Sequence, residues 1–234
     1  MIDPRERLII ALDVSSAAAA QKIVAAVGDS AFTYKVGMQL YTAEGPQVVR
    51  DLVASGKRVF LDLKYHDIPN TVASAVAEAA TLGVTMLTVH ASGGSKMLRA
   101  AVEAARTAHI PLTVLGVTVL TSLNDLDLER IGVHVRVEDE VVRLAALAVA
   151  EGCQGVVASP REAARLRGEL GSDFVIVTPG VRPAGAEHGD QARVMTPAEA
   201  IAAGATHIVI GRPITAATNP EEQARAIVAD LAAA

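Results

Sequence analysis

The feature that most constrains the fold of this 234-residue chain is a regular alternation of short apolar runs with longer Ala-rich segments. The apolar runs are rich in Val, Ile and Leu and are only a few residues long. Such runs are typical of strands that are buried on both faces of a parallel sheet. Eight of them occur, at residues 8–14, 32–36, 59–63, 86–89, 112–119, 155–158, 174–177 and 208–210.

An amphipathic helix is predicted after each strand. Ser159 and Thr196 each precede a proline, which is the pattern of an N-cap residue followed by proline in the first turn. Gly56 and Gly83 follow helical patterns, as glycines at helix C-termini do. The predicted helices lie near residues 16–27, 43–55, 71–82, 94–107, 138–151, 160–169, 197–203 and 220–232.

Eight such units in 234 residues average about 29 residues each, which suits parallel strands joined by right-handed helical crossovers. We therefore predict an α/β fold, a (β/α)8 TIM barrel that forms a single domain over residues 1–234. The competing architecture is an open doubly wound sheet, which typically carries a Gly-rich turn after its first strand. Residues 13–16 contain no glycine, and no linker divides the chain. The segment 183–190 is interpreted as a mobile loop after the seventh strand.

Composition limits the partners. The net charge of −5, the absence of a basic run and the aromatic content of 3% argue against nucleic acid. The mean hydropathy of +0.35 comes from short apolar runs that fall far short of a membrane span, so no membrane is expected. Cys153 is the single cysteine, which excludes an internal disulfide and favours a buried thiol and a cytoplasmic location.

Charged residues are concentrated at the predicted C-terminal ends of the strands, where the active site of such a barrel lies. Asp62 and Lys64 are two positions apart, a spacing that places both side chains on one face of a strand. Asp67 lies beyond them in a loop, and Lys35 ends the preceding strand. Two cations and two anions can thus form an alternating array. The alternative interpretation is an ion-pair network with a purely structural role.

Three chemistries compete for this array. A divalent metal would be repelled by Lys35 and Lys64, and His66 and His90 form no ligand pattern, so we expect no metal. A Schiff-base lysine must lose its proton, whereas flanking carboxylates favour the ammonium form. The pattern therefore favours Lys64 as a proton donor to a carbanion formed beside Asp62.

A second group of residues indicates a phosphate pocket. Gly180 and Arg182 follow the seventh strand, and Gly211 and Arg212 follow the eighth. In many barrels phosphate binds at the ends of these two strands, where glycine allows close approach of the backbone and arginine supplies a charged clamp. Local cations of this kind allow an anionic substrate to bind a chain of negative net charge.

These residues resemble the bacterial-type orotidine 5′-monophosphate decarboxylase family over nearly the whole chain. The matching segments are 11–13, 35–38, 62–71, 117–122, 178–182, 190–191 and 211–212. The resemblance implies that Lys64 protonates C6 of the pyrimidine after carbon dioxide leaves from beside Asp62. It further implies contacts of Asp13 and Lys35 with ribose hydroxyls, of Thr121 with the pyrimidine edge, of Arg182, Gln191, Gly211 and Arg212 with phosphate, and of Asp67 and Thr71 with the neighbouring subunit's site.

The leading interpretation is a homodimeric enzyme with shared active sites that converts orotidine 5′-monophosphate to uridine 5′-monophosphate in pyrimidine synthesis without a cofactor. The enzymatic alternative is a magnesium-dependent sugar-phosphate decarboxylase or aldolase of the same barrel superfamily, which shares the Asp-x-Lys-x-x-Asp pattern. A third interpretation is a barrel that binds a phosphorylated ligand without catalysis. That would require a broken element in the array, and none is broken at Asp62, Lys64 or Asp67.

Overall fold

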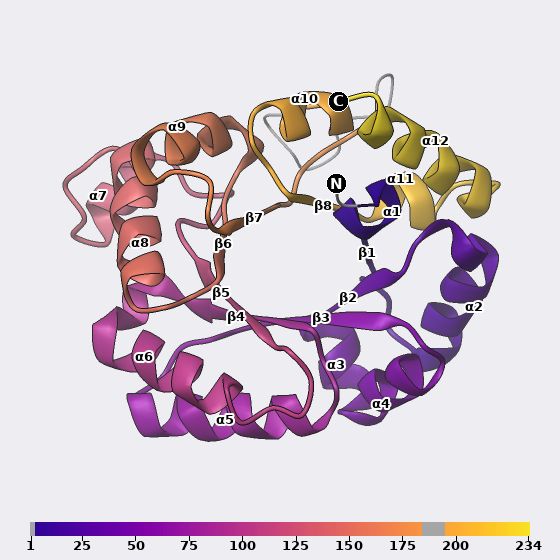
Figure 1. Ribbon diagram of the computed structural model, residues 1–234, viewed down its shortest axis with the longest axis horizontal. Coiled ribbons are helices and arrows are strands. Elements are labelled where there is room, and N and C mark those ends of the chain that lie inside the picture. Colours follow the sequence, from indigo (N-terminus) through magenta and orange to yellow (C-terminus); the bar gives the residue numbers. More distant parts are fainter. Residues whose placement is uncertain (1–2, 184–194) are drawn as a thin grey trace.

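The computed structural model describes residues 3–183 and 195–234, which fold into a closed barrel of eight parallel strands (Figure 1). Each strand pairs with its neighbours in sequence, and β1 closes the barrel by pairing with β8, where Ile9 lies opposite Val209. The predicted (β/α)8 barrel is thus confirmed. The strands are β1 (Leu8–Ala11), β2 (Thr33–Gly37), β3 (Arg58–Tyr65), β4 (Met86–His90), β5 (Thr113–Val117), β6 (Gly155–Val157), β7 (Val175–Thr178) and β8 (His207–Ile210).

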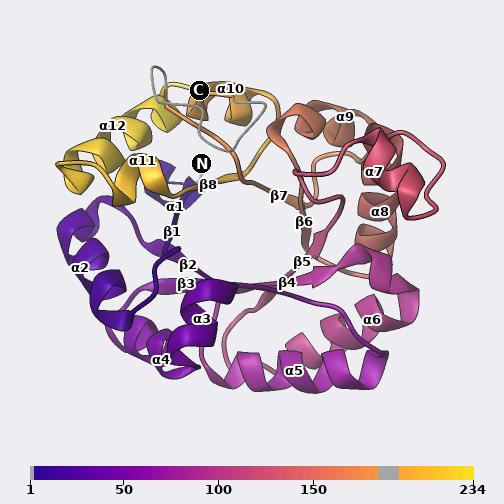
Figure 2. The same cartoon turned by 180° about the vertical axis from the view of Figure 1, so that it is seen from behind.

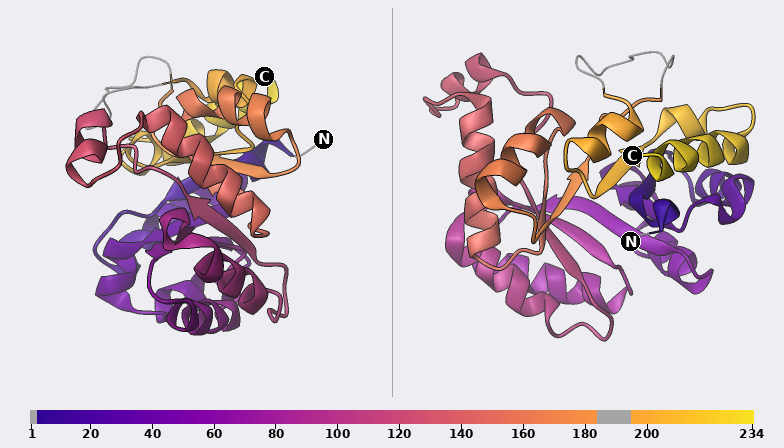
Figure 3. Two further views of the ribbon diagram at one scale, coloured as in Figure 1. Left: turned by 90° about the vertical axis from the view of Figure 1, so that its left-hand side faces the viewer. Right: turned by 45° about the horizontal axis from the view of Figure 1, so that its top comes forward.

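The helices form a ring outside the barrel, as Figures 1 and 2 show from the two ends. Helices α5 and α6 lie side by side along one flank (Figures 1 and 3). The long helices are α2 (Ala17–Val27), α4 (Gln47–Ala54), α5 (Pro69–Thr81), α6 (Gly94–Ala105), α8 (Val137–Ala150), α9 (Pro160–Leu170) and α12 (Pro220–Ala232); the shorter ones are α1 (Pro4–Arg7), α3 (Met38–Glu44), α7 (Asp125–Arg130), α10 (Pro197–Ala202) and α11 (Arg212–Thr215).

The single helix predicted over 43–55 was wrong in its extent. Two helices, α3 and α4, occupy this part of the chain, and α3 begins directly after β2. Gly45 ends α3 with a φ of 66°, and Pro46 follows it. A left-handed residue followed by proline cannot continue a helix, so the chain turns before α4 begins.

Apolar residues form two separate cores. The larger core lies between the strands and the surrounding helices. The smaller core lies inside the barrel, and we call its residues the inner core: Ile9, Ala11, Phe60, Leu115, Val177 and Val209. Because side chains alternate along a strand, Asp13 and Asp62, two positions beyond the inner-core residues Ala11 and Phe60, are expected to face the barrel axis at the C-terminal rim.

Gly155 on β6 allows two strands to approach closely. A Cβ atom at this position would lie 2.4 Å from the backbone oxygen of Val175 on β7. Residue 155 therefore has no room for a side chain. Within the two described ranges, no helix is long and apolar enough to cross a membrane. The segment 183–190, interpreted above as a mobile loop, lies almost entirely outside the described residues.

Candidate active site

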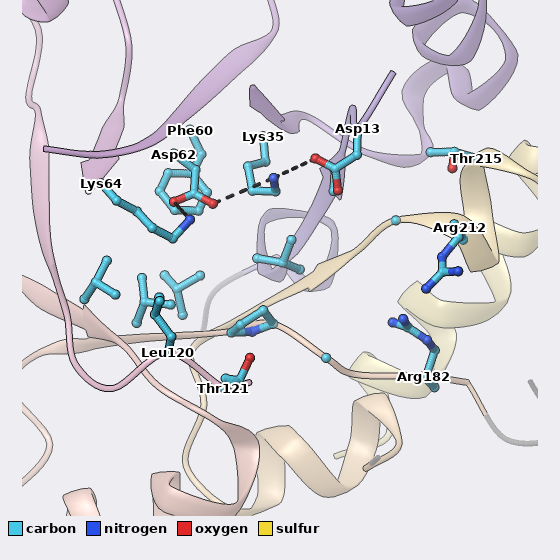
Figure 4. Close-up of a pocket in the computed structure, with 18 of the residues that line it drawn as sticks. Asp13, Lys35, Phe60, Asp62, Lys64, Leu120, Thr121, Arg182, Arg212 and Thr215 are labelled. Atoms are coloured by element: carbon cyan, nitrogen blue, oxygen red, sulfur yellow. Dashed lines mark hydrogen bonds and ion pairs between the residues drawn. The ribbon is translucent and has the colours of Figure 1, made fainter. Parts of the chain in front are cut away.

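A pocket of about 460 Å³ opens at the C-terminal ends of the strands (Figure 4). Its position agrees with the general location of active sites in (β/α)8 barrels. Eight of the predicted site residues line it: Asp13, Lys35, Asp62, Lys64, Thr121, Arg182, Gly211 and Arg212.

Four of these residues form an alternating chain of charges at one end of the pocket. The Nζ atom of Lys35 lies 2.9 Å from Oδ1 of Asp13 and 3.7 Å from Oδ2 of Asp62. The Nζ atom of Lys64 donates to Oδ1 of Asp62 at 2.8 Å. The side chains of Lys35, Asp62 and Lys64 are 12%, 13% and 23% exposed, whereas that of Asp13 is 58% exposed. Each of the three largely buried ions has an opposite charge beside it, as burial of a charge requires.

The backbone of β3 is irregular where it carries these groups. Leu61 pairs with Leu87 and Tyr65 pairs with Val89, so β3 has two more residues than β4 over the same stretch. Lys64 lies in this bulge with a φ of 53°, and among the described residues it is the only non-glycine with a positive φ. The bulge redirects Lys64 so that its amine reaches Asp62. The sequence spacing therefore predicted the right contact, although the strand is not regular there.

Asp67 and Thr71 do not line the pocket of their own chain. The Asp67 carboxylate accepts a hydrogen bond from the backbone N–H of Ile68 at 2.6 Å and is exposed, and Thr71 lies exposed in the first turn of α5. Within one chain the fourth member of the charge array is Asp13, where the sequence pattern had suggested Asp67. The resemblance places Asp67 and Thr71 in a neighbouring subunit's site, and their exposure leaves them accessible to one.

Two arginines lie at the opposite end of the pocket (Figure 4). Arg182, 8% exposed, follows β7, and its Nη1 atom donates to the backbone oxygen of Val181 at 3.0 Å. Arg212 is the first residue of α11, directly after β8 and Gly211. Two guanidinium groups beside a glycine provide charge and close backbone approach for a phosphate group. Gln191, the fourth predicted phosphate contact, lies outside the described residues.

Between the two charged ends the pocket is mostly apolar. Thr121, in the segment that follows β5, supplies a hydroxyl there, and Phe60 and Leu120 supply apolar surface (Figure 4). Phe60 and Leu120 were not predicted from the sequence as site residues. The alternation along β3, in which Phe60 precedes Asp62 by two positions, is a signal that would have pointed to the former.

The other titratable residues considered from the sequence, His66 and His90 near the rim and Cys153 before the start of β6, do not line this pocket. The rings of His66 and His90 lie 5.3 Å apart, and burial, with further contributions from His66 and Lys64, lowers the pKa of His90. Cys153 is buried, and burial raises the pKa of its thiol to about 12. No group of three or more His, Cys, Asp or Glu residues within 3–183 and 195–234 is arranged to hold a metal ion.

Comparison with known proteins identifies a matching family model and relatives that match almost the full length of the chain. Residues 6–227 match the family model described as "Orotidine 5'-phosphate decarboxylase / HUMPS family". The chain is 53% identical over 232 residues to orotidine 5′-phosphate decarboxylase of Afipia carboxidovorans, with 99% of this chain and 97% of the relative covered. It is 51% identical over 239 residues to the same enzyme of Syntrophotalea carbinolica, with 100% and 98% covered.

Solved structures that resemble this chain include a member of the same family. The crystal structure of orotidine 5′-phosphate decarboxylase from Lactobacillus acidophilus superimposes with a TM-score of 0.87 at 37% identity, covering 97% of this chain and 99% of that one. An uncharacterized conserved protein from Geobacillus kaustophilus superimposes with a TM-score of 0.84 at 34% identity, covering 96% and 99%. Sequence and structure together establish that the chain belongs to the orotidine 5′-phosphate decarboxylase / HUMPS family.

Proposed function

We propose that this protein decarboxylates orotidine 5′-monophosphate to uridine 5′-monophosphate in pyrimidine synthesis, without a metal or an organic cofactor. The observation that carries this proposal is the Asp13–Lys35–Asp62–Lys64 chain of charges, which shares one pocket with Arg182 and Arg212. The names of the relatives that match almost the full length of the chain support the choice of substrate.

The chemical step uses Asp62 and Lys64. The substrate carboxylate would lie beside Asp62, so that two like charges face each other before reaction and the repulsion ends when neutral carbon dioxide departs. The bond between C6 and the carboxylate carbon breaks, and its electron pair stays on C6. The Lys64 ammonium, 2.8 Å from Asp62, then gives a proton to C6, and the resulting neutral amine regains one from water.

The remaining residues bind parts of the substrate that do not react. Asp13 and Lys35 are joined at 2.9 Å and offer an acceptor and a donor to the ribose hydroxyls. Among the residues that line the pocket, we assign Thr121 to the pyrimidine edge and Arg182, Gly211 and Arg212 to the phosphate. Gln191 is assigned to the phosphate on the resemblance alone. Binding energy from this remote dianion can offset the cost of holding the substrate carboxylate near Asp62.

The magnesium-dependent alternative is disfavoured by the surroundings of Asp62. One carboxylate oxygen accepts from Lys64 at 2.8 Å, and the other lies 3.7 Å from Lys35. A divalent cation bound to Asp62 would stand next to two ammonium groups, which repel it. The alternating charges thus favour a reaction in which the lysines, rather than a metal ion, stabilise negative charge.

An ultraviolet assay with orotidine 5′-monophosphate in the presence of excess chelator tests this function. We expect loss of substrate absorbance at the same rate with and without chelator. Activity that disappears with chelator and returns with Mg²⁺ would transfer the assignment to the sugar-phosphate alternative. Binding of orotidine 5′-monophosphate without turnover would instead indicate a barrel that only binds a phosphorylated ligand.

We also propose that the enzyme is a homodimer in which each site takes Asp67 and Thr71 from the partner. This is supported by the exposure of both residues in one chain and by that of Ile68 between them, which is 67% exposed. An apolar side chain of this size at an exposed rim suits contact with another protein surface. The single, buried cysteine is compatible with the cytoplasm as the place of the reaction.

A further inference from the structure

A buried hydroxyl links the backbone of Lys64 to the carboxylate of Asp62. Thr88 lies on β4, two positions beyond Met86, and is fully buried. Its Oγ1 atom accepts a hydrogen bond from the backbone N–H of Lys64 at 2.9 Å and donates one to Oδ1 of Asp62 at 3.1 Å. One side chain on β4 therefore contacts the two residues of β3 to which the chemical step is assigned.

We propose that Thr88 is a positioning residue for proton transfer, which sets the place of the Lys64 amine relative to Asp62 without touching the substrate. This inference rests on the decarboxylase function proposed above. Thr88 is absent from the residues that line the pocket, whereas Asp62 and Lys64 are among them. Its effect on the reaction thus passes through these two residues.

The bulge in β3 explains why a side chain is needed at this point. Between the pairs Leu61–Leu87 and Tyr65–Val89 the regular ladder is interrupted, and Thr88 lies opposite the interruption. A backbone N–H that leaves a ladder needs another acceptor if it is buried. The Thr88 hydroxyl is that acceptor for Lys64, and it helps to hold the left-handed conformation in which Lys64 has a φ of 53°.

The direction of the hydrogen bonds also fixes the carboxylate. A hydroxyl has a single proton. Oγ1 of Thr88 accepts from the Lys64 N–H, and it donates its own proton to Asp62. Oδ1 of Asp62 then accepts two hydrogen bonds, from the Thr88 hydroxyl at 3.1 Å and from the Lys64 amine at 2.8 Å, while Oδ2 faces Lys35. Removal of the hydroxyl would free the carboxylate to rotate away from the geometry of the reaction.

The test compares Thr88→Val, which keeps the shape but removes the hydroxyl, with Thr88→Ser, which keeps the hydroxyl. Hydrogen bonds to charged groups change equilibria by roughly 10- to 100-fold, so we expect Thr88→Val to lower kcat by about that factor. KM should stay within about threefold, because an interaction that acts only on the chemical step leaves ground-state binding unchanged. Thr88→Ser should recover most of kcat.

Thr206 offers a matched control at the other end of the barrel. Its hydroxyl also accepts a backbone N–H, from Ile176 at 3.0 Å, and donates to the oxygen of the same residue at 2.9 Å. Thr206→Val should lower the melting temperature and leave kcat unchanged. An equal loss of kcat in Thr206→Val and Thr88→Val, or a Thr88→Val enzyme with wild-type kcat, would overturn the proposal.

A second measurement does not depend on activity. Amide hydrogen exchange of Lys64 should be faster in Thr88→Val than in the wild type and in Thr88→Ser, because the N–H loses its acceptor. Unchanged exchange would refute the positioning role even if kcat falls. A wild-type protein that does not turn over orotidine 5′-monophosphate would refute the proposed function, while the exchange data would still decide the role of Thr88.

Discussion

Lys64 combines an unusual backbone conformation with the shortest link in the charge array, so its side chain is the first to test. Lys64→Ala removes the proposed proton donor and leaves Asp62 facing the substrate carboxylate without a nearby cation other than Lys35. General acid catalysis typically contributes about 10²- to 10⁴-fold, so kcat should fall by at least that much. Steady-state kinetics with orotidine 5′-monophosphate measures the loss, and circular dichroism checks that the fold persists.

The control for this variant is Lys57→Ala. Lys57 precedes β3 at the opposite end of the barrel, where its Nζ atom donates to the backbone oxygen of Gly28 at 3.3 Å. Removing this amine should leave kcat unchanged. A Lys64→Ala enzyme that keeps more than about a tenth of wild-type kcat would be incompatible with a proton-donor role.

For individual residues, the sequence predicts which residues belong to the site better than it predicts the contacts between them. Asp62, Lys64 and Lys35 were predicted to pair because charges in apolar strands need partners, and they do. The sequence could not show that Asp13 would be the fourth member of the charge array within one chain. The direction of the backbone after each strand decides which loop residue reaches the array, and this direction is not visible in the sequence. Thr88 was missed because one threonine in an apolar strand looks like any other until the bulge opposite it is seen.

At the scale of single elements, substitution of alanine for glycine should change the free energy of unfolding in opposite directions at two positions, Gly155 and Gly168. Gly155→Ala on β6 would place a Cβ atom 2.4 Å from a backbone oxygen of β7, and backbone cannot move aside cheaply. Overpacking of this kind typically costs about 1–3 kcal/mol, so the free energy of unfolding should fall by that amount or more. Gly168→Ala lies within α9 with nothing within 4 Å of the added atom.

Gly168→Ala should therefore increase the free energy of unfolding by about 0.5–1 kcal/mol, because alanine loses less backbone entropy in a helix. Urea unfolding of both variants and the wild type measures the two changes. A stabilised Gly155→Ala protein would contradict the close approach of β6 and β7. A destabilised Gly168→Ala protein would contradict the open surroundings of α9.

Element boundaries that carry local chemical signals were predicted well. Ser159 and Thr196 are the N-cap residues of α9 and α10, as the proline that follows each of them indicated. Reciprocal contacts with Glu162 and Glu199, which were not predicted, complete the two caps. The short helices α3 and α7 were not predicted as separate helices, because a turn or two of helix contains too few residues to show a hydrophobic period. The reciprocal contact between Asn124 and Asp127 that caps α7 is a signal that was overlooked. The bulge in β3 is likewise a property of two strands together, which a single strand's sequence does not reveal.

At the scale of the whole molecule, a mixing experiment tests the shared active site. Lys64→Ala and Asp67→Asn should each be nearly inactive as homodimers. In a mixed dimer one site contains both changes and the other contains neither, since every contact of a two-fold interface occurs twice. With random exchange of subunits, about a quarter of all sites should regain activity. A mixture no more active than its components, with exchange verified by mass spectrometry, would contradict the sharing of Asp67.

The stability of the molecule should depend on His207 in mildly acidic solution. Burial, followed by the charge of Arg7, lowers the pKa of this histidine from 6.5 to about 4. Between pH 4 and pH 6.5 the unfolded chain binds more protons at this histidine than the folded chain does. The contribution of neutral His207 to the free energy of unfolding is therefore fully present above pH 6.5 and is lost as the pH falls towards 4. Between pH 7 and pH 5, protonation of His207 in the unfolded chain should lower the free energy of unfolding by about 2 kcal/mol.

Urea unfolding at pH 7 and pH 5 of the wild type and His207→Gln measures this contribution. The decrease in the free energy of unfolding should be about 2 kcal/mol larger in the wild type than in the variant. His134→Gln, which changes an exposed histidine, should behave as the wild type does. Equal decreases in the wild type and His207→Gln would show that His207 titrates alike in the folded and unfolded chain.

The inner core has a consequence for how strongly the charges of the site act. Ala11, Phe60, Val177 and Val209 belong to this core and also form part of the pocket wall, so hydrocarbon rather than water lies beneath the ions. Two unit charges 4 Å apart interact by about 1 kcal/mol in water but by about 4 kcal/mol at an effective dielectric constant of about 20. The dielectric environment of Asp62 and Lys64 is therefore set by side chains that carry no charge. A polar replacement of Val209 would weaken the field at C6 while every charged group stayed in place.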